Sequence, residues 1–146
     1  MAHLFDIFVP GIPVPQGSKT PWGTEANPQT RPWRATLAWY ARKAWNAKPP
    51  MSGPLYLVVE FFFPRPKSHY RTGKNAGKLK PTAPRWKPGK PDGDKLQRAV
   101  QDALVDAGVI RDDALFVAWH GSKEYADQPG VKIIVTEEPD NDPPNT

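Results

Sequence analysis

The stretch KPDGDKLQRAVQDALVDAGVIRDDA, residues 90–114, gathers six aspartates into a chain that is otherwise basic. Its middle predicts a helix from residue 93 or 94 to about residue 107, because apolar residues recur there on one face. The apolar positions are Leu96, Val100, Ala103, Leu104 and Ala107. The opposite side carries Asp94, Arg98, Gln101 and Asp102. Gly108 is well suited to end this helix.

The segments on both sides of this stretch complete a small fold. A second helix is expected at residues 32–47, where Trp33 and Trp45 would anchor the core. Strands are expected at residues 4–9, 55–63, 115–125 and 130–137, the last two joined as a hairpin. The pattern predicts one α+β domain over residues 1–137, with two helices packed on a small mixed or antiparallel sheet. Residues 138–146 are acidic and proline-rich, and we expect a disordered tail.

Composition excludes several classes of protein. The 146 residues include no cysteine, so a disulfide framework and a thiolate metal site are ruled out. No apolar run approaches the roughly 20 residues that a membrane helix needs, and no export signal begins the chain. We therefore expect a soluble protein of the cytoplasm that has no membrane partner.

Positive charge is concentrated in one loop. Twenty basic residues face only eleven acids in residues 1–136, a surplus that favours a polyanionic partner such as nucleic acid, although solubility alone is the alternative. Residues 64–91 contain nine of the twenty, and we expect a basic DNA-binding loop in which Tyr70 and Trp86 stack on unpaired bases. A flexible solvated insert is the alternative. The candidate DNA contacts are Lys19, Lys67, Arg71, Lys74, Lys78, Lys80, Arg85, Lys87 and Lys90.

The aspartates form two pairs, one on each side of the predicted helix. Asp92 and Asp94 precede it and Asp112 and Asp113 follow it, so about 21 Å of helix separates the pairs unless the next strand folds back. Close carboxylates that stay ionised need a compensating cation, and oxygen ligands suit Mg²⁺, with Mn²⁺ as an alternative. Helix capping, surface pairing of Asp102 with Arg98 and turn formation are the alternatives for the individual acids. Glu60 is a further candidate ligand, or else an outward-facing strand residue.

The sequence PDGDKLQRAVQDALVDAGVIRDDALFV, residues 91–117, resembles the signature of RusA-family Holliday junction resolvases. In that signature a D-x-D-N pair opens a helix, a lysine follows four residues later, and DAL, a glycine and DD come before a strand. The resemblance implies a homodimeric, Mg²⁺-dependent endonuclease of phage or prophage type that cuts four-way DNA junctions by paired nicks. By position it implies that Asp92, Asp94 and Asp113 are the catalytic and metal-binding acids. Asp112 is a further candidate ligand, and Asp102 matches the acid of DAL.

Two positions depart from the signature. Lys95 stands in place of its asparagine and Arg98 in place of its lysine. Arg98 would still bind a phosphate, but a guanidinium holds its proton too firmly for acid–base work, so Lys95 is a second candidate for the lysine's role. The basic loop is also longer than the family leads us to expect. The alternative functions are a non-catalytic DNA-binding protein of phage recombination and a metal-dependent nuclease for flaps or forks.

Overall fold

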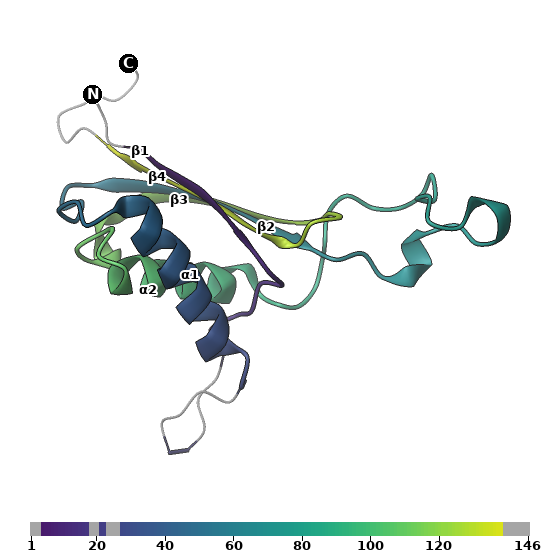
Figure 1. The fold of residues 1–146 in the computed structure, drawn as a ribbon, viewed down its shortest axis with the longest axis horizontal. Coiled ribbons are helices and arrows are strands. Elements are labelled where there is room, and N and C mark those ends of the chain that lie inside the picture. The colour runs from purple at the N-terminus through teal and green to yellow at the C-terminus, as the bar shows by residue number, and fades with distance from the viewer. Residues whose placement is uncertain (1–3, 18–20, 23–26, 139–146) are drawn as a thin grey trace.

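The computed structural model describes residues 4–17, 21–22 and 27–138. Every predicted helix and strand is present, and each observed end lies within two residues of its expected position (Figure 1). The elements are β1 (Leu4–Pro10), α1 (Thr30–Trp45), β2 (Leu55–Phe63), α2 (Gly93–Asp106), β3 (Phe116–Tyr125) and β4 (Gly130–Glu137). Lys19 and residues 139–146 of the expected tail lie outside the described residues.

The four strands form one mixed sheet in the order β1-β4-β2-β3. β2 pairs antiparallel with β4 and parallel with β3, which confirms the α+β fold with a mixed sheet. The predicted hairpin between β3 and β4 is wrong, because β2 lies between them. Buried and half-buried residues alternate along the whole of β2. Its central position in the sheet lets both of its edges form hydrogen bonds with neighbouring strands. The four residues 126–129 connect β3 to β4 across β2. They need to cross only two strand spacings, about 10 Å, which four residues can span.

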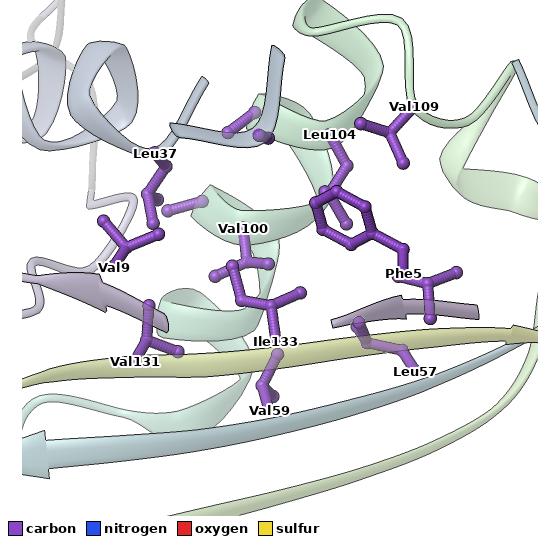
Figure 2. Close-up of a cluster of buried hydrophobic side chains, with 14 of the residues drawn as sticks. Phe5, Val9, Leu37, Leu57, Val59, Val100, Leu104, Val109, Val131 and Ile133 are labelled. Atoms are coloured by element: carbon purple, nitrogen blue, oxygen red, sulfur yellow. The ribbon is translucent and has the colours of Figure 1, made fainter. Parts of the chain in front are cut away.

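Both helices cover the same face of the sheet, and the hydrophobic core lies between these two layers (Figure 1). Leu57 and Val59 of β2 and Ile133 of β4 meet Val100 and Leu104 of α2 there (Figure 2). Burial of each such side chain stabilises the fold by about 1.5–3 kcal/mol relative to exposure. The predicted core role of the two α1 tryptophans is confirmed, since Trp33 and Trp45 are both buried. Neither helix combines the length and apolarity that crossing a lipid bilayer requires, as far as the described chain goes.

Residues 64–91 form an arm that projects beyond the end of the sheet (Figure 1). Backbone bonds cross it from Arg71 N to the Lys78 carbonyl at 2.8 Å and from Lys80 N to the His69 carbonyl at 2.9 Å. At its base, Tyr125 of β3 donates to the Arg85 carbonyl at 2.9 Å, and Lys87 donates to the Lys123 carbonyl at 3.0 Å. The arm therefore has internal pairing and is joined to the free edge of β3.

Candidate active site

One acid of each aspartate pair, Asp94 and Asp113, lines the same cleft because β3 folds back along α2. Gly108, at φ 75°, ends the helix in the left-handed region, and residues 109–111 then pair with Met51 beside the start of β2. β3 runs from there toward the helix N-terminus, where Lys123 reaches the carbonyl of Pro91. The reversal that the sequence left open is thus present. It places Asp113 in one cleft with Asp94 and Arg98 and in a second cleft with Asp102 and Asp106 of the same helix.

Asp94 and Asp113 line one cleft of about 340 Å³, which we call the acid cleft. Asp94, Arg98 and Gln101 face it together because positions i, i+4 and i+7 lie on one side of a helix. The remaining wall comes from the start of β3 and the turn before it. The lining residues are Asp94, Gln97, Arg98, Gln101, Asp113, Phe116 and Trp119.

Asp92 lies outside the acid cleft. It occupies the N-cap position of α2 but makes no capping hydrogen bond with its side chain, which instead lies 3.9 Å from the ammonium of Lys95. Both residues border a separate cavity of about 490 Å³ beside the proline-rich first loop. Within the described residues, no three acidic or histidine side chains stand close enough to hold one metal ion. The geometry supports Asp94 and Asp113 as partners, and the participation of Asp92 stays a prediction.

The pKa values of Asp112 and Asp113 are shifted in opposite directions. The Ala114 backbone N–H donates to the Asp112 carboxylate at 3.0 Å, and this hydrogen bond lowers the pKa of Asp112. The pKa of Asp113 is raised, first by the hydrogen bond that it shares with Asp112, then by partial burial and by the charges of Asp112 and Asp102. Asp112 therefore caps the short turn Asp113–Leu115, as the turn alternative anticipated, and it concentrates negative charge at Asp113.

The cation of the acid cleft is Arg98. Its side chain is exposed, and it has no acidic partner in the described part of the chain. Asp102, the predicted surface partner of Arg98, lies instead 3.9 Å from Arg34 of α1. Lys95 is directed to Asp92. Of the two candidates to replace the family lysine, only Arg98 therefore lines the same cleft as Asp94 and Asp113.

Two residues of β3 that sequence reasoning missed also border the site. The ammonium of Lys123 donates to the carbonyls of Pro91 at 2.8 Å and Gly89 at 2.5 Å. Trp119 forms part of the acid cleft although its side chain is 60% exposed. The alternation of β3, once its register with β2 is known, places both on the face that carries the helices.

Glu60 does not belong to the site. It pairs in register with Lys132 of β4 and alternates with Val59 and Phe61, which are buried on the helix side. Its side chain therefore lies on the opposite face of the sheet, and the outward-facing alternative is confirmed.

The basic residues of the arm are mostly unpaired. Of its nine lysines and arginines, only Arg85 has an acidic partner among the described residues, Glu124 at 3.6 Å. Two others contact uncharged groups: Arg65 donates to the Pro84 carbonyl at 2.7 Å, and the ammonium of Lys87 donates to the Lys90 carbonyl and lies 5.3 Å from the centre of the Phe63 ring. The arm thus presents positive charge that the protein itself leaves largely uncompensated, and its DNA contacts stay a prediction.

Comparison with known proteins identifies the family. A family model described as endodeoxyribonuclease RusA matches residues 10–136. The chain belongs to the RusA endodeoxyribonuclease family. A Bacillus subtilis strain 168 protein, named as uncharacterized protein YqaN, is 32% identical over 92 residues, and this match spans 60% of each chain. The RusA resemblance of residues 91–117 is confirmed, and the family match also includes the arm.

Proposed function

We propose that this RusA-family chain is a Mg²⁺-dependent endodeoxyribonuclease that resolves four-way DNA junctions by paired nicks. One observation carries the proposal: two carboxylates from different elements, Asp94 and Asp113, line one cleft together with the unpaired Arg98. Such an arrangement combines metal ligands with a phosphate-binding group, and metal-assisted phosphodiester hydrolysis uses both. We place the activity in the cytoplasm of a bacterial host.

The residues present fit a hard divalent cation. Mg²⁺ takes oxygen ligands and is commonly bound through one or two carboxylates, its other positions going to waters and substrate phosphates. The pKa of Asp113 is raised first by the hydrogen bond with Asp112, then by burial and by the charges of Asp112 and Asp102, and a bound cation would offset those charges. Asp94 and Asp113 would hold the ion, and Asp92 is the third candidate. The same donors suit Mn²⁺. A bound ion would supply Lewis acidity toward the phosphate and the attacking water.

The side chains of this chain would then act on the phosphate directly. Arg98 can bind two phosphate oxygens with its forked guanidinium and offset the charge that develops as water attacks. Lys95 would hold Asp92 until substrate enters, because the two side chains are paired in its absence. Lys123 would keep the segment before Asp92 against β3.

The arm and a second copy of the chain would provide the fit to a junction. The unpaired cations of residues 64–91 would bind phosphates along one DNA arm and release counterions. A four-way junction has a two-fold axis, so we propose an isologous homodimer in which each copy makes one nick. A flap or fork has no such axis, which is why we favour the junction.

Cleavage of defined DNA substrates tests this function. Labelled four-way junction, flap and linear duplex would each be incubated with the protein in Mg²⁺ or in EDTA, beside the variants Asp94→Asn and Asp106→Asn. Asp106 is a matched control, because it lies on the same helix but pairs with Arg34 at the surface. We expect symmetric junction nicks that require Mg²⁺ and Asp94 but not Asp106. Preferred flap cleavage, binding without cleavage, or activity of Asp94→Asn would each contradict the proposal.

A further inference from the structure

Trp119 is a large aromatic side chain left in solvent at the centre of the candidate site. It lies on β3, opposite Leu57 of β2, and it is 60% exposed whereas Leu57 is fully buried. Trp39 and Trp86 are exposed as well, but each ring lies against a cation, Lys43 at 4.7 Å and Arg85 at 4.3 Å. No such contact, and no ring–ring contact, involves Trp119 within the described residues. Folding therefore does not explain its exposure.

Trp119 separates two clefts that share a wall. One is the acid cleft, and the other, of about 320 Å³, is bordered by Gly121 and Lys123 of β3. Asp94 and Gln97 line both clefts. Gly121 has no side chain to cover the strand beside the indole. The side-chain oxygen of Gln97 lies 3.6 Å from the position that a Cβ of residue 121 would occupy. Amide and carboxylate groups therefore lie beside the indole, together with Phe61 and Phe116 in the walls of the two clefts.

We propose that Trp119 is a specificity-determining residue that stacks on a nucleobase of the DNA strand whose phosphate lies at Asp94 and Asp113. The inference rests on the proposed function. Every base offers a flat face to an indole, and stacking of this kind does not need a paired base. Gln97 and Gln101, both half-buried along the same side of α2, would hydrogen-bond the edge of that base. The substrate class that this arrangement selects is a strand with a base unstacked next to the scissile phosphate, as occurs where duplexes branch.

A nucleobase fits this place better than an apolar protein segment. Besides Phe61 and Phe116, the clefts provide the carboxylates of Asp94 and Asp113, the guanidinium of Arg98 and the amides of two glutamines. A buried apolar partner would leave these groups without water, at a cost that stacking alone does not offset. A nucleotide would supply a phosphate for Arg98 and for the proposed metal ion. The polar edge of its base would supply hydrogen-bond partners for the amides of Gln97 and Gln101.

Binding to probes with and without bases tests the inference. The affinity of a fluorescent 20-nucleotide strand would be measured by anisotropy in EDTA, beside an abasic strand of equal length and charge. We expect Trp119→Leu and Trp119→Ala to weaken binding of the normal strand at least about fivefold and to leave abasic binding within about twofold. Trp119→Phe should retain most of the affinity. The leucine variant keeps apolar bulk on the strand, so the test does not depend on the alanine variant folding.

Trp39→Ala is the matched control, because it removes an exposed indole on α1 without touching either cleft. Equal losses on both probes, or unchanged affinity in both Trp119 variants, would overturn the inference. Junction cleavage by the unaltered protein separates this outcome from the proposed function. Cleavage with no Trp119 effect would overturn the inference alone, and a base-dependent Trp119 effect without cleavage would overturn the proposed function alone.

Discussion

Lys123 on β3 donates a hydrogen bond of 2.8 Å to the carbonyl of Pro91, the residue directly before Asp92. The same ammonium also donates to the carbonyl of Gly89. These two bonds tie the end of the basic arm to the strand that borders the acid cleft. Lys123 is therefore a positioning residue for the segment that leads into Asp92 and Asp94.

Replacing Lys123 by methionine should lower the turnover rate on a junction by about 10- to 100-fold, because a small displacement of the acids disturbs the reacting geometry. KM should change much less, since Lys123 holds backbone carbonyls of the protein. Lys123→Arg keeps a charged donor and should recover part of the rate. The measurement is steady-state cleavage with kcat and KM determined separately. An unchanged kcat in Lys123→Met would exclude the positioning role.

Arg98→Lys should preserve or raise cleavage activity, because a lysine keeps the positive charge and adds a group that exchanges protons more readily. Arg98→Met, which removes the charge, should lose about 100- to 1000-fold in kcat, the scale of losing one donor to the transition state. Single-turnover cleavage of a labelled junction compares the three proteins. A loss greater than about 100-fold in Arg98→Lys would mean that the forked guanidinium geometry is essential here.

The arm should contribute salt-dependent affinity. Changing Lys74, Lys78 and Lys80 together to glutamine should weaken junction binding and reduce the slope of log affinity against log salt by up to about three, since each lost phosphate contact removes about one unit. A control that changes exposed Arg31, Lys43 and Lys48 of the α1 region to glutamine removes the same charge elsewhere. Titrations in EDTA at several salt concentrations measure both slopes. Equal slopes for the two triple variants would show that net charge, and not the arm, binds DNA.

The carboxyls of Asp112 and Asp113 should titrate on opposite sides of the usual aspartate pKa. Asp113 holds its proton more tightly in the folded chain than in the unfolded one, so its stabilising contribution is complete at low pH and declines as pH rises through the raised folded pKa. Asp112 behaves in the opposite way, and its contribution is lost as pH falls through its lowered folded pKa. Carbon-detected NMR titration of the metal-free protein measures both groups.

Asp112→Asn should bring the pKa of Asp113 down toward its usual value, because the substitution removes the neighbouring charge while an amide oxygen can still accept from Ala114. Asp106→Asn serves as the comparison, since Asp106 pairs with Arg34 and is not among the groups that shift Asp113. A pKa of Asp113 that does not respond to Asp112→Asn would show that burial and the charge of Asp102 raise it without Asp112.

Local patterns in the sequence were sufficient for the elements and for most of the candidate site. The apolar periodicity of α2 placed Leu96, Val100 and Leu104 in the core and left Asp94 and Arg98 on the other side, as the structure confirms. The aromatic and β-branched residues 55–63, which end at Pro64, predicted the nine residues of β2. Such features are encoded in neighbouring residues, because helix and strand periods are properties of the local backbone.

The order of the strands and the assembly of the site were decided by tertiary structure. Three features join residues that are far apart in the chain. β2 lies between β3 and β4, β3 returns along α2, and Lys123 contacts the carbonyl of Pro91. Tertiary structure also separated Asp92 from Asp94, since positions two residues apart at a helix start face different directions and the side chain of Asp92 pairs with Lys95. The sequence by itself predicted the candidate residues Asp92, Asp94, Asp113 and Arg98, but it did not point to Lys123 or Trp119. Which of these residues share a cleft depends on how the sheet packs against the helices. That packing buries the apolar faces of both layers, and it forms only when the whole chain has folded.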